Sequence, residues 1–381
     1  MLTHYTHRPT FALIDLDALE HNYNTIKDRL GPDVRILSVM KADAYGHGSV
    51  ALAANLERLG VAAFGVAFCE EGVRLREGGI TRPILVLGGI YWGEAMKAHY
   101  YNLTPVIISR ENALATIAQA RDAGISFGVH VKIDTGMNRI GVQPEEAVEV
   151  SRLIRDSGVL QIDGYLTHLS GVMPSLDDNY WKQATAFRDA VQSLEDEDLD
   201  APWKHLAASA ASMAAPRPPF NMVRIGIAML GAFPNPNFRG MLDLKPVLTL
   251  RTQIAHLKTI PVGARVSYGG LWEAKRPSVI ATIPMGYADG LNRRQSNTGH
   301  ALVRGVRVPI TGAVCMDMAM LDVTDVPGVS LGDEVVLIGA QGDERITVEE
   351  VADVVGTSAY EIFTNINYRV ARIYRKAQPT P

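Results

Sequence analysis

The stretch RILSVM at Arg35–Met40 is an apolar run of the length that is typical of a buried strand. A helical pattern precedes it near Asp17–Leu30, where apolar residues recur at helical spacing. Asp17 with Glu20 resembles a capping box, and Gly31 follows as a helix stop. An alternation of helix and strand therefore begins here.

Seven further runs of the same kind follow, and amphipathic helical stretches such as Asn112–Ala123 and Pro144–Arg155 lie between them. The eight runs are Arg35–Met40, Val61–Phe68, Pro83–Leu87, Leu103–Ile107, Ile125–Ile133, Leu160–His168, Trp203–Leu206 and Met222–Ile227. Strands joined by helices must be parallel, because each connection crosses back over the sheet. Eight such units in roughly 200–250 residues predict a (β/α)8 TIM barrel. A doubly wound open sheet is the alternative, but no G-x-G-x-x-G follows the first strand.

The pattern changes after Phe233–Asn237, which is typical of a linker. Short strands set off by Gly, Pro and Asp then predominate, with one helical pattern at Val348–Val355. The expected strands are Val247–Leu257, Val279–Ile283, Ala301–Ile310, Ala319–Val323 and Glu334–Ile338. We therefore expect a barrel domain at residues 1–240 and a mostly β domain at residues 241–381. A first strand near residues 11–16 is a candidate partner of the second domain.

Composition narrows the class of protein without indicating a chemistry. The chain has 381 residues, with 37 Lys and Arg against 41 Asp and Glu, so its net charge is −4. Such a small, balanced charge argues against nucleic acid or an anionic membrane as the main partner. The two cysteines, Cys69 and Cys315, exclude a disulfide framework. Together with a polar N-terminal stretch and no apolar run that could span a bilayer, they predict a cytoplasmic protein, and no metal site is expected.

Unusual polar residues gather where the predicted barrel strands end. Catalytic residues of TIM barrels lie at this end of the strands. The polar residues are Lys41 and Tyr45 after the first strand, Lys132 and Arg139 at the fifth, His168 at the sixth, Ser209 after the seventh and Arg224 at the eighth, where Gly226 and Ile227 follow. Their shared position predicts one active site.

Lys41 is the centre of this predicted site. A lysine directly after an apolar strand can lose solvation at the barrel mouth, so that its pKa falls and its amine can form a Schiff base. The plain alternative is a surface lysine that ends a strand. Ser209 and Gly226–Ile227, in the loops after strands seven and eight, suit a phosphate group. A Schiff-base lysine with a phosphate site suggests pyridoxal phosphate.

Arg224 narrows the chemistry of such a cofactor. A cation beside the pyridine nitrogen disfavours protonation of that nitrogen, which weakens the ring as an electron sink. Transamination and decarboxylation are then suppressed, and removal and return of a proton at the α-carbon remains. A structural arginine paired with an acid is the alternative reading of Arg224.

The motifs taken together resemble those of the alanine racemases, pyridoxal-phosphate enzymes with an N-terminal TIM barrel and a C-terminal β domain. The matching segments are Val39–Gly48, Asp134–Gly141, Arg224–Ile227, Val266–Gly269, Gly286–Gly290, Cys315–Asp317 and Tyr360–Ile362, with Arg369 and Arg372. The resemblance implies a homodimeric isomerase that interconverts L-alanine and D-alanine. It further implies two bases acting through an external aldimine of pyridoxal 5′-phosphate, and a supply of D-alanine for peptidoglycan.

The resemblance also implies roles for individual residues. Lys41 is then the Schiff-base lysine and the base for D-alanine. Tyr268, donated by the second subunit, is the base for L-alanine. His168 and Arg224 are implied to form a hydrogen-bonded chain that supports Tyr268, because a tyrosine with a pKa of about 10 is a poor base at neutral pH.

The remaining implied residues hold the substrate and the cofactor. Arg139 and the backbone of Met316 are implied to receive the substrate carboxylate. Lys132 resembles a lysine that is carbamylated in many members of the family and holds Arg139 in place. The residues implied to bind the phosphate are Tyr45, Ser209, Gly226, Ile227 and Tyr360.

Three positions depart from the family pattern. Ala208 stands where many members have Asn, Leu230 where many have Tyr, and Ala313 where Arg is common. The last leaves strict alanine specificity open, so a broad-specificity amino-acid racemase is one alternative. A basic amino-acid decarboxylase is a second, although it needs an acid where Arg224 stands. A non-enzymatic pyridoxal-phosphate carrier is a third, although such carriers lack a β domain.

Overall fold

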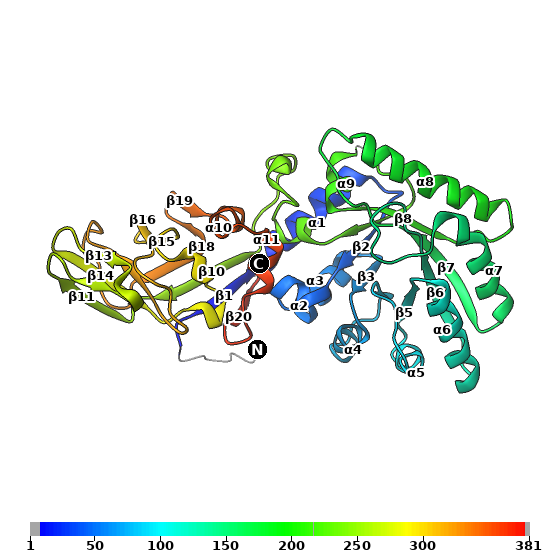
Figure 1. The fold of residues 1–381 in the computed structure, drawn as a ribbon, viewed down its shortest axis with the longest axis horizontal. Coiled ribbons are helices and arrows are strands. Elements are labelled where there is room, and N and C mark those ends of the chain that lie inside the picture. Colours follow the sequence, from blue (N-terminus) through cyan, green and yellow to red (C-terminus); the bar gives the residue numbers. More distant parts are fainter. Residues whose placement is uncertain (1–7, 216, 378–381) are drawn as a thin grey trace. The chain divides into compact units, whose positions relative to one another are not determined.

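The computed structural model describes residues 8–215 and 217–377, whose contacts divide them into two compact units (Figure 1). The barrel unit comprises Glu20–Met229 and Phe233–Leu244. The β unit comprises the described residues before Glu20, residues Leu230–Ala232, and those from Lys245 onward.

Eight parallel strands close into a barrel within the described residues, in the order β2 to β9. They are β2 (Arg35–Val39), β3 (Ala63–Val66), β4 (Ile84–Val86), β5 (Thr104–Ile107), β6 (Phe127–Lys132), β7 (Leu160–Leu166), β8 (Trp203–Ala208) and β9 (Met222–Ile225). Each overlaps its predicted apolar run. The ring closes where β2 pairs with β9, with Leu37 opposite Arg224. The predicted TIM barrel is therefore confirmed, and the open sheet is excluded.

Helices connect the strands and surround the barrel (Figure 1). They are α1 (Leu16–Leu30), α2 (Lys41–Gly46), α3 (Ser49–Leu59), α4 (Cys69–Glu77), α5 (Ala95–Tyr100), α6 (Arg110–Ala123), α7 (Ala147–Ser157), α8 (Asp178–Glu195) and α9 (Ser209–Ala214). Side-chain caps position several of them. Ser109 accepts a hydrogen bond from the N–H of Asn112 at the start of α6, and Asp177 accepts one from Tyr180 at the start of α8.

The predicted cap of α1 is wrong. The carboxylate of Asp15, not that of Asp17, accepts the first free N–H groups, from Asp17 and Ala18, at 3.0 Å each. The reason is that the helix begins earlier than expected, at Leu16. Gly31 ends α1 as predicted, with a φ of +81° that favours glycine.

Apolar and polar side chains share the interior of the barrel. Leu37, Ala63, Leu85 and Met222 form a buried cluster, and Trp203 packs against it. The polar residues His130, His205 and Arg224 are buried in the same unit. Because buried polar groups need partners, this interior already indicates a specialised network.

The β unit contains three sheets within the described part of the chain. Its elements are β1 (Phe11–Asp15), β10 (Leu248–Gln253), β11 (His256–Ile260), β12 (Arg265–Val266), β13 (Trp272–Glu273), β14 (Ser278–Ile283), β15 (His300–Val303), β16 (Val306–Pro309), β17 (Ala319–Asp322), β18 (Glu334–Gln341), β19 (Glu344–Ile346), α10 (Val348–Val355), α11 (Ala359–Thr364) and β20 (Ala371–Arg375). The largest sheet has the order β16-β15-β18-β10-β1-β20, with β19 on β18. The others are β11-β14-β17 and β12-β13.

β1 joins the beginning of the described chain to its end. It pairs antiparallel with β10 and parallel with β20, so that Phe11 lies opposite both Arg251 and Ala371. The mostly β character expected of this part of the chain is confirmed.

Two segments that were each expected to form one strand form two strands instead. Val247–Leu257 divides into β10 and β11. Ala301–Ile310 folds into the β15–β16 hairpin, because Arg304 and Gly305 take positive φ values of 52° and 78°. The stretch predicted as a linker, Phe233–Asn237, packs with the barrel unit instead and leads to the buried Phe238.

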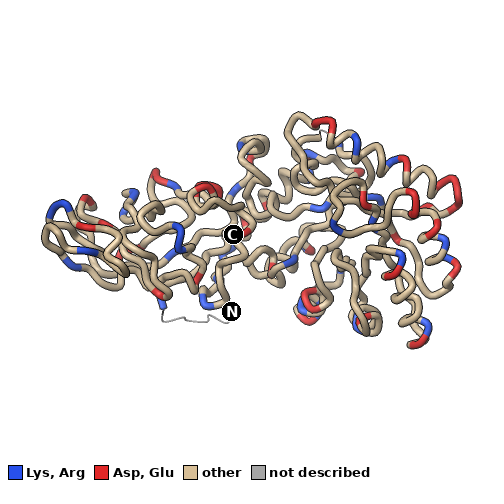
Figure 2. The backbone as a smooth tube through the Cα atoms, in the orientation of Figure 1, with Lys and Arg blue, Asp and Glu red and all other residues tan. Residues whose placement is uncertain are grey.

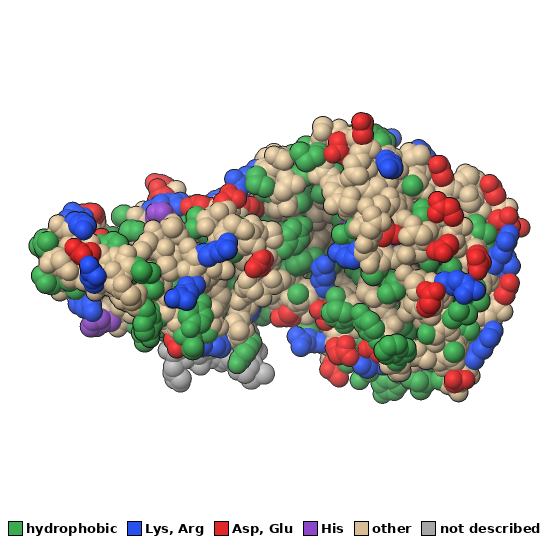
Figure 3. Space-filling model, in the orientation of Figure 1, with side chains coloured by type: hydrophobic (Ala, Val, Ile, Leu, Met, Phe, Trp, Pro, Cys, Tyr) green, Lys and Arg blue, Asp and Glu red, His purple; other side chains and the backbone are tan. Residues whose placement is uncertain are grey.

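The surface shows no large field of one charge sign on the face drawn in Figure 3. Lys, Arg, Asp and Glu are mixed there on each unit. Among the described helices, none has the length and apolar character needed to cross a bilayer.

Candidate active site

The candidate residues of the barrel unit lie at or near the carboxyl ends of its strands. Lys41 follows β2, Lys132 ends β6, His168 follows β7, Ser209 follows β8 and Arg224 lies in β9. Figure 2 shows many of the acidic residues of this unit on the surrounding helices. The strand ends thus bring together the basic and hydroxyl groups that the sequence singles out.

Directly after Lys41, the backbone takes a left-handed conformation that L-residues disfavour. Ala42–Tyr45 form a left-handed turn with φ values of 50°, 54°, 54° and 52°. Each such residue costs about 1–2 kcal/mol. Strain of this kind persists only where surrounding contacts enforce it, and it gathers at functional sites.

Two carboxylates enforce this turn. Glu71 of α4 accepts hydrogen bonds from the N–H groups of Ala42 and Ala67, each at 2.6 Å. Asp43 accepts from the N–H and the hydroxyl of Ser49 at 2.8 and 2.9 Å. The turn is therefore held from both sides, and it fixes the start of the segment that carries Lys41 and Tyr45.

The Lys41 amine lies in an environment that disfavours its charge. Desolvation lowers the pKa of Lys41, the positive charge of Arg139 lowers it further, and Glu71 opposes them. The Nζ atom lies 5.9 Å from the centre of the Tyr45 ring. A lowered pKa increases the neutral amine, which is the nucleophilic form.

Tyr45, Ser209 and Gly226 converge on one point of the barrel unit. The N–H of Gly226 donates to the Ser209 hydroxyl at 3.1 Å. A Cβ at Gly226 would lie 2.5 Å from the Tyr45 hydroxyl oxygen, so only glycine permits this approach. Ile227 follows, buried, at the start of a 3-10 turn. Two hydroxyls and backbone N–H groups in this arrangement can hold a phosphate.

Arg224 is buried without a carboxylate partner among the described residues. Its side chain donates to the carbonyl oxygens of Thr167, His205 and Leu206 at 2.6, 2.8 and 3.1 Å. It also donates to the Nδ1 atoms of His205 and His168, each at 3.2 Å. Burial lowers the pKa of Arg224 to about 10, so it stays charged at neutral pH. The alternative of a structural Arg–acid pair is wrong.

His168 is held neutral by its surroundings. Burial lowers the pKa of His168 to about 3, and the charge of Arg224 acts in the same direction. Because arginine can only donate, the His168 Nδ1 must accept, and its proton must lie on Nε2. The expected contact between His168 and Arg224 is thus present.

Lys132 and Arg139 flank the loop after β6. Burial lowers the pKa of Lys132 to about 8, and the charges of Arg139 and Arg224 lower it as well. Asp134 accepts hydrogen bonds from the backbone N–H groups of residues 136–139, at 2.9 to 3.1 Å. Burial raises the pKa of Asp134, but these N–H donors outweigh it and hold the pKa below its usual value. The carboxylate of Asp134 thus holds the backbone of this loop, whereas the Arg139 side chain is exposed.

Tyr268 and Met316 lie on adjoining loops of the β unit. Tyr268 is 73% exposed and follows Ser267, whose hydroxyl donates to the carbonyl oxygen of Ala313 at 2.6 Å and lies 3.3 Å from the Cys315 sulfur. Within the described residues, the Met316 N–H has no hydrogen bond recorded. This N–H can therefore donate a hydrogen bond to a bound ligand.

A buried carboxylate anchors these loops. Asp289 accepts hydrogen bonds from Arg8 at 2.8 and 2.5 Å and from the N–H of Gly286 at 3.0 Å, and it lies 3.3 Å from Arg369. The turn that begins at Gly286 in turn donates, from Ala288 N–H, to the Met316 carbonyl oxygen at 3.0 Å. Asp289 thus fixes the loop on which Met316 lies.

Tyr360 also belongs to the β unit, in α11. Burial raises the pKa of Tyr360 to about 12, so its hydroxyl stays protonated and can donate. Sequence reasoning missed Glu71, His130, His205 and Asp289 as members of these networks. Asp289 lies inside a quoted motif, but nothing in the sequence shows its partners.

A closed parallel barrel with a desolvated lysine, a hydroxyl-lined cradle and a buried cation at its strand ends defines a TIM-barrel enzyme. The family model "Alanine racemase, N-terminal domain" matches residues 14–234, and "Alanine racemase, C-terminal domain" matches residues 247–374. The chain belongs to the alanine racemase family, and it is an enzyme of that family.

Similar proteins cover the chain almost completely. An alanine racemase of Halothermothrix orenii is 42% identical over 369 residues, 97% of each chain. That of Geobacter sulfurreducens is 42% identical over 372 residues, 96% of this chain and 97% of the relative. A solved alanine racemase of Clostridium difficile 630 matches with a TM-score of 0.90 and 36% identity over 96% of both chains. One from Bacillus anthracis with bound L-Ala-P matches with a TM-score of 0.91 and 36% identity over 97% of this chain and 96% of that one.

Proposed function

We propose that this chain interconverts L-alanine and D-alanine with pyridoxal 5′-phosphate, by moving the α-proton between two bases. The observation that carries the proposal is Arg224, a buried cation that contacts carbonyl oxygens and imidazoles but no acid among the described residues. Family membership supplies the substrate and the cofactor, and Arg224 supports racemisation over the other reactions of that cofactor.

The barrel unit fits the cofactor. The absence of a side chain at Gly226 leaves a cradle beside the Tyr45 hydroxyl that a Cβ would fill. We assign the phosphate to Tyr45, Ser209, Gly226, Ile227 and, from the β unit, Tyr360. Lys41 is assigned as the lysine that carries the cofactor covalently. When bound, pyridoxal phosphate supplies the electron withdrawal that acidifies the α-proton of an amino acid.

Arg224 restricts how far that withdrawal goes. Its two terminal amino groups are engaged, whereas no hydrogen bond of its Nε is recorded within the described residues. The Nε–H is therefore the group assigned to the pyridine nitrogen. Since a charged guanidinium can donate but not accept, it would favour the form of that nitrogen that carries no proton. Decarboxylases of the same cofactor need the opposite, so this alternative is disfavoured.

Two residues are assigned as bases. Lys41 takes or returns the α-proton of D-alanine, and Tyr268 that of L-alanine. Groups on opposite faces of a planar carbon can invert it without turning the substrate. The hydroxyl of Tyr268 needs support to act as a base, and His168 is assigned that role because its neutral Nε2–H can donate to the phenolate.

Tyr268 is assigned to the site of a second copy of the chain, so the active enzyme is proposed to be a homodimer. Its 73% exposure in the single chain supports this, because the side chain is free to enter another site. We propose a barrel domain at residues 1–240 and a β domain at residues 241–381, with the strand Phe11–Asp15 pairing with the β domain.

The substrate carboxylate is assigned to Arg139 and the Met316 N–H. Lys132 is proposed to be carbamylated: its neutral amine adds to carbon dioxide, the new N–C bond forms, and one proton leaves. A pKa of about 8 supports this, since a sizeable fraction of the amine is neutral near physiological pH. The resulting negative charge would offset those of Arg139 and Arg224.

Formation of D-alanine from L-alanine, measured by a coupled D-amino-acid oxidase assay with and without added pyridoxal phosphate, tests the proposal. We expect D-alanine to form, faster with the cofactor, and L-serine and L-lysine to react more slowly. Release of carbon dioxide without D-alanine would contradict it. The proposed cellular role is to make D-alanine in the cytoplasm, as a precursor for peptidoglycan.

A further inference from the structure

The contacts of Arg224 continue through the barrel interior to a second buried histidine. The Nε2 of His205 lies 2.9 Å from the Nδ1 of His130, and the two rings are edge to face with their centres 5.0 Å apart. Both residues are almost fully buried, at 0% and 2% exposure. A chain of hydrogen bonds therefore runs from His168 through Arg224 and His205 to His130.

The direction of each hydrogen bond in this chain follows from Arg224. A guanidinium has donors only, so the Nδ1 of His205 must accept from it. His205 then carries its proton on Nε2, and this N–H donates to the Nδ1 of His130. His130 in turn must have a bare Nδ1. Burial lowers the pKa of His130 to about 3 and that of His205 well below its usual value, so both rings are neutral.

We propose that His130 is a positioning residue for the proposed racemisation, because it accepts the His205 Nε2–H and so keeps the His205 Nδ1 free to hold Arg224. The inference rests on the proposed function. Without this acceptor, His205 loses the partner of its buried N–H. The other tautomer would place an N–H against the Arg224 amino group and repel it.

The surroundings of His130 are shaped for this ring. Gly164 of β7 lies opposite His130 in the parallel pairing of β6 and β7. A Cβ at Gly164 would lie 2.5 Å from Cε1 and 2.6 Å from Nδ1 of His130, so glycine is needed to admit the imidazole. The position of the His130 Nδ1 is thus set by the sheet and not by the histidine alone.

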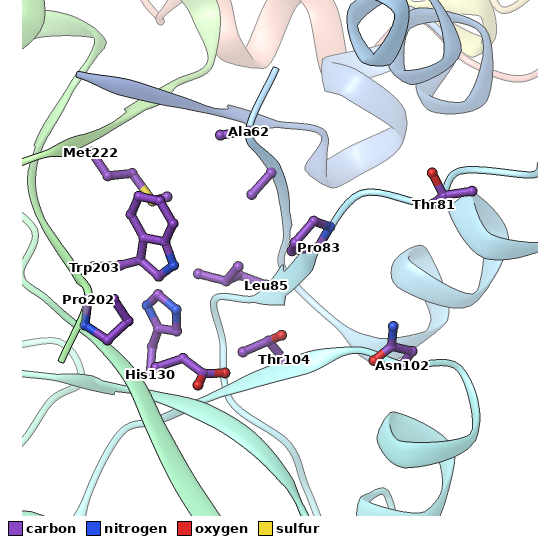
Figure 4. Close-up of a pocket in the computed structure, with 12 residues that line it drawn as sticks. Ala62, Thr81, Pro83, Leu85, Asn102, Thr104, His130, Pro202, Trp203 and Met222 are labelled. Atoms are coloured by element: carbon purple, nitrogen blue, oxygen red, sulfur yellow. The ribbon is translucent and has the colours of Figure 1, made fainter. Parts of the chain in front are cut away.

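His130 also lines a cavity at the amino ends of the barrel strands. Its volume is about 240 Å³, and its lining includes Thr104, Trp203 and Met222, each at or near the start of its strand. Figure 4 shows the His130 imidazole beside the Trp203 indole at this cavity. The cavity is large enough for water, which can accept from the His130 Nε2–H that the tautomer requires. His130 therefore lies between a cavity with room for water and His205, the group that holds Arg224.

Two substitutions separate this role from simple filling of space. His130→Leu removes the acceptor, and His130→Asn keeps an oxygen near the former Nδ1. His99→Leu is the matched control, because His99 is an exposed histidine on α5 of the same unit. The measurements on the holoenzymes are kcat and KM for L-alanine, and the long-range ¹H–¹⁵N NMR pattern of labelled histidines, which reports the tautomer of each ring.

We expect the wild type to show His205 protonated on Nε2 only. His130→Leu should lower kcat by roughly 10-fold with little change in KM and should alter the His205 pattern, since a buried donor is left unpaired. His130→Asn should stay within about threefold of wild type, and His99→Leu should match it. These results would support the positioning role.

The inference is overturned if wild-type His205 carries its proton on Nδ1, if His130→Leu matches His99→Leu, or if His130→Asn loses as much activity as His130→Leu. If the leucine variant does not fold, the wild-type tautomers and His130→Asn still decide. Failure of the proposed function gives a different result, because the wild type itself would then form no D-alanine. An active wild type with an unaffected His130→Leu overturns this inference alone.

Discussion

The barrel unit and the β unit hold one buried charge each, Arg224 and Asp289, in opposite ways. Arg224 is 4% exposed and contacts backbone carbonyl oxygens and two neutral imidazoles. Asp289 is 0% exposed and contacts the guanidinium groups of Arg8 and Arg369. One charge is solvated by dipoles, and the other is neutralised by ion pairs.

This difference separates a charge that can act on a bound cofactor, Arg224, from a charge that stabilises the fold, Asp289. Carbonyl and imidazole acceptors stabilise a guanidinium without cancelling its net charge, so Arg224 can still act on a neighbouring ring nitrogen. Two arginines cancel the charge of Asp289, whose contacts serve to fix the turn beneath Met316. Substitution of each charge should therefore have a different consequence.

Arg224→Glu replaces the guanidinium proposed to face the ring nitrogen of the cofactor with a carboxyl group. An acid at the ring nitrogen favours its protonation, so racemisation should fall about 10³-fold, while the amino group of alanine begins to pass to the cofactor, with one pyruvate formed for each cofactor converted to its amine form. Chiral chromatography of alanine and a pyruvate assay measure the two products. Arg224→Lys, which keeps the charge, should form little pyruvate. A glutamate variant with wild-type racemisation and no pyruvate would show that Arg224 is only structural.

Asp289→Asn removes the buried negative charge that fixes the loops of the β unit. Two arginines then lack their shared buried partner, and the free energy of unfolding should fall by about 3–5 kcal/mol. Urea unfolding followed by circular dichroism measures this loss. Asp317→Asn is the control, because Asp317 is exposed and its pair with Arg369 should contribute no more than about 1 kcal/mol. Equal losses in the two variants would contradict the assigned role of Asp289.

Tyr268→Phe tests whether the β unit also supplies a reacting group. Removal of the α-proton from L-alanine should slow by at least about 100-fold, whereas removal from D-alanine by Lys41 should change by less than about 10-fold. Exchange of the α-proton with D₂O, followed by NMR for each enantiomer separately, measures both steps. Tyr368→Phe, at a highly exposed tyrosine of the same unit, should change neither. Equal losses for both enantiomers would argue against two bases.

Modification of Lys132 would show how the barrel unit offsets the positive charges near Arg139. With a pKa of about 8 instead of the usual value of 10.5, its neutral fraction grows as the pH rises through 8, so carbamate should form there and be lost on acidification. Carbon-13 NMR with labelled carbon dioxide detects the adduct. Lys132→Gln should lack the signal and raise KM for alanine about fivefold. An unmodified Lys132 at pH 8 in carbonate would leave Arg139 to be held by another group.

The sequence is sufficient to predict the barrel but not its internal contacts. Its strands are apolar runs between helices, so local pattern and chain order determine them. The left-handed turn of Ala42–Tyr45 has no such pattern, because none of its residues is glycine and Glu71, which holds it, lies on another helix. His130 and His205 look like ordinary strand residues, and only the barrel brings their rings together.

The β unit was harder to predict for a related reason. Its largest sheet joins β1 to β20, which lie at opposite ends of the described chain. Such a partner leaves no local signal, and two-residue strands such as β12 are too short for a period to appear. The candidate residues were found from motifs, whereas Asp289 gained a role only when its partners were placed around it.

The roles assigned to the barrel unit all depend on Lys41 being the lysine that carries the cofactor of this alanine racemase. Borohydride reduction of the holoenzyme, followed by peptide mass mapping, tests this assignment most directly because the reduced cofactor stays attached to its lysine. We predict a single pyridoxyl-modified peptide with the label on Lys41, and loss of that label in Lys41→Ala. A label on another lysine beside an unmodified Lys41 would contradict the account.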